Sequence, residues 1–176
     1  MQSNSLASQR NNETGRPLGR VYRLALSLAA VIVLLDQASK WLILTQVMVP
    51  PRVIEITGFF NLVLTFNTGI SFGLFGGDAA WQPWLLIALS LSIVAGLLWW
   101  LRGQDRRLPV AAIGLIVGGA IGNVIDRVHL PGVVDFLDVH AAGWHWPAFN
   151  VADSAITIGV ALLIIDGLFG EAERGK

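Results

Sequence analysis

Four long apolar segments constrain this chain more than any other feature of its sequence. They cover about residues 24–44, 81–101, 108–125 and 151–169, and each is close to the roughly 20 residues that a helix needs to cross a bilayer. Of all 176 residues, 54% are hydrophobic and only 14% are charged, whereas soluble domains average about 45–50% apolar and about 25% charged residues. We therefore expect an all-α membrane protein with four transmembrane helices.

The positions of lysine and arginine predict how these helices are oriented. Nine of the 12 basic residues lie before the first span, between the second and third spans, or after the fourth. By the positive-inside rule, both chain ends then face the cytoplasm. We expect one membrane domain over residues 21–170, between a disordered tail of residues 1–20 and a short cytoplasmic tail of residues 171–176.

The two segments on the outer side of the membrane contain patterns typical of β-structure. In residues 61–67, Leu62, Leu64 and Phe66 alternate with smaller or polar residues, as in a half-buried strand. Residues 133–138 form a second extended apolar segment, after a Pro-Gly turn. These patterns predict a small β-containing platform at the outer membrane surface.

The composition excludes several kinds of chemistry. The chain has no cysteine, and its 12 basic residues equal its 12 acidic residues in number, so thiol chemistry is excluded and binding to nucleic acid is not expected. Asp138, His140 and His145 could ligate a metal, but they do not form a recognised metal-binding motif. We predict no metal and no cofactor.

Charged residues within a bilayer are costly unless they are paired, and each is therefore a candidate for function. Asp36 and Lys40 are four residues apart on one face of the first span, in the order that favours an ion pair. This pair either packs the helix or faces a substrate, and the sequence leaves both interpretations open. In the third span, Gly114, Gly118 and Gly122 form a stripe where another helix can approach closely.

Further polar residues gather at the outer ends of the third and fourth spans. Asn123, Asp126 and Arg127 could form an Asp–Arg network that holds the following loop. Asn150 is placed to cap the fourth helix. Asp153 lies just inside that helix, where a purely structural role is harder to assign.

Two carboxylates at the outer membrane boundary indicate an aspartic hydrolase. In a partly desolvated site two acids share one proton, so that the ionised acid activates water and the protonated one polarises the scissile carbonyl. The residues alone do not decide whether Asp126, Asp135 or Asp138 is the partner of Asp153. One alternative is a small proton-coupled transporter that uses Asp36, Lys40 and Asp153 as a relay. Another is a noncatalytic membrane scaffold.

Five motifs, taken together and in this order, resemble the bacterial lipoprotein signal peptidase family, also called signal peptidase II. The resemblance covers about residues 31–170, and the motifs are DQASK at 36–40, FNTG at 66–69, GGAIGNVIDR at 118–127, VVDF at 133–136 and FNVADS at 149–154. The resemblance implies an intramembrane aspartyl endopeptidase that removes the signal peptide from prolipoproteins. It would cut just before a cysteine that carries a diacylglyceryl group.

The resemblance also implies roles for individual residues. It makes Asp135 and Asp153 the catalytic pair and gives Asp126 a structural role. Other matched positions would line or support the substrate pocket: Asp36, Lys40, Asn67, Gly69, Asn123, Arg127 and Asn150. The expected partners are diacylglyceryl-prolipoproteins and membrane lipids. We expect a monomer in the bacterial inner membrane, with its active site at the outer face.

Overall fold

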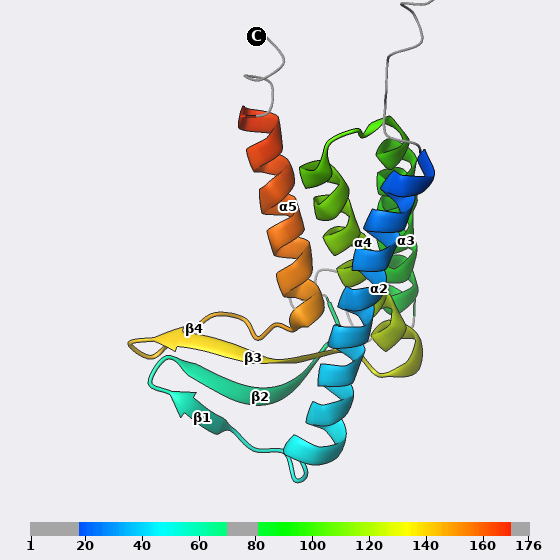
Figure 1. Ribbon diagram of the computed structural model, residues 1–176. Helices are drawn as coiled ribbons and strands as arrows, with labels where there is room; N and C mark the ends of the chain where they lie inside the picture. The colour runs from blue at the N-terminus through cyan, green and yellow to red at the C-terminus, as the bar shows by residue number, and fades with distance from the viewer. Residues whose placement is uncertain (1–17, 70–80, 170–176) are drawn as a thin grey trace, which may run out of the picture.

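The computed structural model describes residues 18–69 and 81–169. In this part of the chain, four helices form a bundle (Figure 1): α2 (Leu18–Leu42), α3 (Gln82–Trp100), α4 (Arg107–His129) and α5 (Val151–Phe169). A π-helical segment, η2 (Ile43–Val47), continues α2, and a 3-10 turn, η3 (Leu101–Gly103), follows α3. All four helices are long and apolar enough to cross a membrane, which confirms the predicted fold class.

Two helices extend beyond their predicted ends. Helix α2 begins at Leu18, so the last three residues of the predicted N-terminal tail are helical. The rest of that tail and residues 170–176 lie outside the described residues. Helix α4 continues to His129 instead of ending near residue 125. Its last turn is stabilised because Arg127 and His129 each bond to the carbonyl oxygen four residues earlier, as basic residues often do at a helix C-terminus.

Helix α4 is the centre of the bundle and packs against α2, α3 and α5. Its glycines permit this close packing. A Cβ atom on Gly118 would lie 2.7 Å from the carbonyl oxygen of Ala29 in α2, and one on Gly119 would clash with the carbonyl oxygen of Ala152 in α5. The predicted glycine stripe therefore does lie at a helix interface, and a neighbouring glycine serves a second interface.

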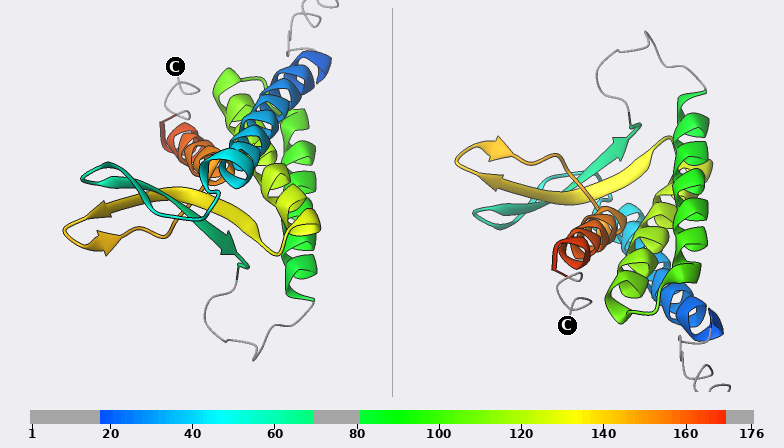
Figure 2. Two further views of the ribbon diagram at one scale, coloured as in Figure 1. Left: turned by 90° about the horizontal axis from the view of Figure 1, so that it is seen from below. Right: turned by 90° about the horizontal axis from the view of Figure 1, so that it is seen from above.

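A four-stranded antiparallel sheet projects sideways from one end of the bundle (Figures 1 and 2). Its strands are β1 (Ile54–Thr57), β2 (Phe60–Asn67), β3 (Val133–Ala141) and β4 (Trp144–His145), paired in that order. The start of α2 and the end of α5 lie at the opposite end of the bundle. Both extended segments predicted from the sequence are strands, β2 and β3. One apolar cluster, which includes Met48, Val134 and Phe136, joins the sheet to η2.

Candidate active site

The N-terminus of α5 places Asp153 at the junction of bundle and sheet. The Asn150 side-chain oxygen accepts a hydrogen bond from the backbone N–H of Asp153, at 2.9 Å. In return, the Asp153 carboxylate accepts the backbone N–H of Asn150, at 3.3 Å. This reciprocal pair is a capping box, which satisfies N–H groups that a helix start leaves free. Asn150 is thus the cap predicted from the sequence.

Strand β3 holds Asp135 beside this helix start. Asp135 is only 1% exposed, and it accepts a 3.0 Å hydrogen bond from the side-chain amide of Asn67, near the end of β2. The oxygen of that amide accepts the backbone N–H of Gly69, at 2.8 Å. Gly69 has φ +88°, a conformation that glycine adopts without strain. This turn therefore aims the NH₂ group of Asn67 at Asp135.

Asn150 joins the two acids. Its side-chain NH₂ donates to Asp135 at 2.7 Å, while its backbone N–H donates to Asp153. Of the three candidate partners of Asp153, Asp135 is the one that shares Asn150 with it. Asp153 is partly exposed, whereas Asp135 is buried, so the pair has one accessible and one enclosed carboxyl group.

The surroundings of Asp135 favour its protonated form. Burial, with a smaller contribution from the charge of Asp153, raises the pKa of the Asp135 carboxyl to about 6, against the opposing effect of the hydrogen bonds from Asn67 and Asn150. Burial has this effect because it removes water from the charged form. Both acids bind the same asparagine, and two carboxyl groups held side by side are the arrangement in which aspartic hydrolases share one proton.

A third asparagine supports Asp153 from α4. The NH₂ group of Asn123 donates to the Asp153 carboxylate at 2.8 Å. The Asn123 oxygen lies 3.2 Å from the ammonium of Lys40 and 3.3 Å from the NH₂ of Asn150. Since both neighbours are donors, they fix which end of the Asn123 amide faces Asp153.

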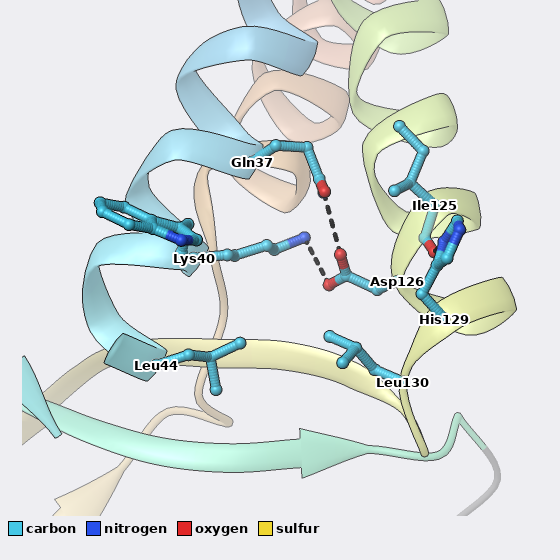
Figure 3. Close-up of a pocket in the computed structure, with 8 residues that line it drawn as sticks. Gln37, Lys40, Leu44, Ile125, Asp126, His129 and Leu130 are labelled. Carbon is cyan, nitrogen blue, oxygen red and sulfur yellow. Dashed lines mark hydrogen bonds and ion pairs between the residues drawn. The ribbon is translucent and has the colours of Figure 1, made fainter. Parts of the chain in front are cut away.

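A buried charge network lies between α2 and α4, and Figure 3 shows its ion pair between Lys40 and Asp126. The Lys40 ammonium is 2.8 Å from both Asp36 and Asp126, and all three side chains are almost fully buried. Asp36 also accepts the backbone N–H of Ala152 at 2.9 Å. The Asp36–Lys40 pair therefore ties α2 to the start of α5, which favours the packing interpretation of the pair.

The prediction that Asp126 and Arg127 form one hydrogen-bonded network is wrong, because each side chain bonds to other residues. Asp126 does hold the following loop, because it accepts the backbone N–H of Val134 at 3.0 Å. Its other partners are Lys40 and Gln37, however, the latter at 2.9 Å. The Arg127 guanidinium instead bonds to the backbone oxygen of Asn123 at 3.4 Å. Adjacent residues on a helix point in different directions, which separates the two side chains.

Asp138 belongs to a different cluster. It accepts a 2.9 Å hydrogen bond from the amide of Asn61, and Nδ1 of His145 lies 2.9 Å from one of its oxygens. The hydrogen bond from His145 holds the pKa of the Asp138 carboxyl below its usual value. His140 stacks on His145. Within residues 18–69 and 81–169, no group of three His, Cys, Asp or Glu residues is placed to hold a metal ion.

The structure thus brings most of the predicted residues together in two adjoining clusters. One contains Asp135 and Asp153, which Asn150 joins and which Asn67 and Asn123 bind singly. The other joins Asp36, Lys40 and Asp126. Sequence reasoning missed the contributions of Gln37 and Asn61. Gln37 lies inside the DQASK motif, between Asp36 and Lys40, and this position is the sequence feature that indicates its role. The role of Asn61 depends on its pairing with Asp138 across two strands, which the sequence does not reveal.

Comparison with known proteins identifies the family. Residues 28–169 match the family model described as signal peptidase (SPase) II. The lipoprotein signal peptidase of Janthinobacterium sp. (strain Marseille) is 46% identical over 144 residues, which are 81% of this chain and 87% of the relative. That of Cupriavidus necator is 41% identical over 162 residues, covering 92% of this chain and 90% of the relative.

A solved structure agrees with this match. It is described as a bacterial membrane enzyme, shares 32% sequence identity, and superimposes with a TM-score of 0.72 over 86% of this chain and 91% of its own. A second such structure also has a TM-score of 0.72, at 33% identity. The fold, the five motifs and these relatives lead to one conclusion: the chain belongs to the signal peptidase II family.

Proposed function

We propose that this protein is an intramembrane aspartyl endopeptidase that removes signal peptides from diacylglyceryl-modified prolipoproteins. The observation that carries the proposal is the pairing of Asp135 and Asp153 through Asn150, at the boundary between bundle and sheet. Membership of the signal peptidase II family supports it. Cleavage occurs just before the lipidated cysteine, and the enzyme acts as a monomer without a metal or cofactor.

The two acids have different tasks in this mechanism. Asp135, which is buried and has a raised pKa, holds the shared proton and donates a hydrogen bond to the scissile carbonyl. Asp153 is partly exposed, and its carboxylate is the base that removes a proton from the attacking water. The water oxygen bonds to the carbonyl carbon to form a tetrahedral intermediate. As its C–N bond breaks, Asp153 passes the proton to the departing amine of the cysteine, and the signal peptide leaves with a new carboxyl group. The asparagines keep both carboxyl groups in place.

The depth of the site suits a lipid-modified substrate. The diacylglyceryl chains of the cysteine remain in the outer leaflet, so the neighbouring peptide bond lies near the membrane surface. Asp153 occupies the first turn of a spanning helix, and Asp135 lies on the adjacent strand. We place the sheet end of the bundle at the outer face of the inner membrane, and both chain ends in the cytoplasm.

The arrangement of charges favours a hydrolase over the transporter considered above. A proton relay needs ionisable groups spaced through the membrane. Between Asp153 and Asp166, α5 has no ionisable residue over 12 positions, a length of about 18 Å at 1.5 Å per residue. Asp166 pairs with Arg106 at the far end of the bundle. The acids at the sheet end therefore serve local chemistry better than transport.

Substitution of the two acids tests the proposal. Asp135→Asn and Asp153→Asn each preserve size but remove the acid or the base, so turnover of a diacylated precursor should fall by several orders of magnitude. The double variant should be little worse than either single variant, because the residues act as one unit. Turnover, precursor affinity and melting temperature are measured for all three variants.

Two controls test whether the loss of turnover is specific to the lipid-modified substrate and to the two acids. An unmodified precursor should be cleaved far more slowly than the diacylated one, since the lipid holds the peptide at the depth of the site. Asp105→Asn removes an exposed carboxylate outside both clusters and should leave turnover unchanged. Efficient cleavage by folded Asp135→Asn or Asp153→Asn protein would refute the assignment.

A further inference from the structure

A cavity lies between the starts of α2 and α4, at the end of the bundle that carries no sheet. Its volume is about 300 Å³, and it is lined by Arg20, Val21 and Leu24 of α2 and by Arg107 and Val110 of α4. These residues belong to neither of the two polar clusters at the other end of the bundle. The mechanism proposed above makes no use of this cavity.

The two arginines of the cavity are unpaired in the part of the chain that the structure describes. The neighbouring Arg106 has an acidic partner, Asp166, at 2.9 Å. Arg20 and Arg107 have neither a salt bridge nor a side-chain hydrogen bond to any described residue, and both are exposed. Since arginine is always charged in proteins, two positive charges repel each other across the cavity. An anion bound between them would remove this repulsion.

The rest of the lining is apolar. Val21 and Val110 are only 2% and 0% exposed and belong to the core between the helices, whereas Leu24 is 42% exposed beside them. Guanidinium groups bind phosphate through two parallel hydrogen bonds, and the apolar lining below them suits hydrocarbon. The cavity therefore fits an amphiphile with a phosphate group better than it fits a free phosphate ion.

The depth of the cavity in a membrane agrees with such a ligand. Arg20 is the third residue of α2, and Arg107 is the first residue of α4. After them, residues 24–35 and 108–125 contain no charged side chain. The arginines thus lie where the apolar spans begin, which is the level of the lipid headgroups. Basic pockets between spanning helices are typical binding sites for anionic lipid headgroups.

We propose that this cavity binds an anionic glycerophospholipid, with its phosphate held by Arg20 and Arg107 and the start of its acyl chains lying against Leu24. Because the two arginines come from different helices, the bound lipid joins the start of α2 to the start of α4. Lipid binding at this site is independent of the proposed peptidase activity. In the orientation proposed above, the lipid belongs to the cytoplasmic leaflet.

A titration of the full chain in detergent micelles tests the site, with bound lipid measured by native mass spectrometry. The native chain should bind phosphatidylglycerol at least about tenfold more tightly than phosphatidylcholine, whose headgroup has no net charge. One arginine beside an anionic headgroup contributes about fivefold in affinity. Arg20→Gln and Arg107→Gln should therefore each weaken phosphatidylglycerol binding about fivefold, and the double variant about 25-fold.

Arg102→Gln is the matched control, since it removes an exposed arginine at the same end of the bundle but outside the cavity, and it should keep the native affinity. An equal loss in Arg102→Gln would overturn the inference, because it would indicate a diffuse effect of positive charge. Native affinity in the double variant would overturn it as well.

Two further measurements use the native chain alone, so they decide the question even if a variant does not fold. Equal affinity for phosphatidylglycerol and phosphatidylcholine would refute an anionic lipid site. Displacement of phosphatidylglycerol by an equal concentration of inorganic phosphate would show that the cavity binds the free ion instead of the lipid. The melting temperature of each variant without added lipid shows whether it is folded.

Discussion

The buried environment of Asp135 predicts how the rate of the proposed reaction depends on pH. In the proposed mechanism the pair needs one proton, and it is assigned to Asp135, whose pKa is raised to about 6. As the pH rises above this value, Asp135 loses the proton and the pair becomes doubly charged. We therefore expect kcat/KM to fall above about pH 6, approaching tenfold per pH unit, and a pH–rate profile checks this.

Asn67 offers a way to attribute that fall to Asp135. Its hydrogen bond stabilises the ionised carboxylate and so lowers the pKa of Asp135. Asn67→Ala should then move the alkaline limb to higher pH, whatever its effect on the maximal rate. An alkaline limb that stays in place in this variant would mean that another group controls it.

Substitution of Lys40 shows how much more a buried ion pair contributes to stability than an exposed one. It neutralises two buried carboxylates, and removing one member of a buried pair typically costs about 3–5 kcal/mol. Lys40→Met should therefore lower the melting temperature strongly. Arg106→Met breaks a pair whose side chains are 31% and 17% exposed, and pairs near the surface contribute about 0–1 kcal/mol. Similar melting temperatures for the two variants would contradict this ranking.

At this scale, the sequence predicts which residues matter better than it predicts their partners. Charged residues in apolar spans stand out because each is costly to bury, so Asp36 and Lys40 could be found directly. The partners come from other elements: Lys40 also reaches Asp126, 86 positions away. For the same reason, the residues alone could not choose Asp135 over Asp126 and Asp138.

Among the elements, the interface of α2 and α4 depends on the absence of a side chain at Gly118. A Cβ atom there would lie 2.7 Å from a backbone oxygen of α2, and backbone cannot move aside locally. Gly118→Ala should separate the helices and cost about 1–3 kcal/mol, as overpacking does. Gly96→Ala is the control, because nothing lies within 4 Å of its Cβ position. Thermal unfolding of both variants in detergent measures the difference.

The elements differ in how well their sequence predicts them. The apolar segments of the helices are long, so their existence follows from hydropathy alone. Their ends do not, as the extra turn of α4 shows, because hydrogen bonds of polar side chains extend it. Strands β1 and β4 have only four and two residues. Segments this short carry little periodic signal, and they are ordered by pairing with β2 and β3.

At the scale of the whole molecule, the bundle has two unlike ends. One carries the sheet and the buried polar clusters, and the other carries the start of α2 and the end of α5 (Figure 1). The loop between α3 and α4 also lies at the second end, where Arg102, Arg106 and Arg107 are found. Of the basic residues counted in the sequence, the five that the structure describes (Arg20, Arg23, Arg102, Arg106 and Arg107) thus lie at the end without the sheet. This distribution is the physical basis of the proposed orientation.

Cysteine labelling tests this orientation directly, because the native chain has no cysteine. Glu55 is exposed on β1, and Asp105 is exposed in the loop before α4, at the opposite end of the bundle. In intact cells whose outer membrane has been made permeable, an impermeant thiol reagent should modify Glu55→Cys and not Asp105→Cys. Lysis of the inner membrane should then expose the second cysteine. The reverse order would place the sheet and the paired acids in the cytoplasm, where the lipid-modified cysteine of an exported precursor could not reach them.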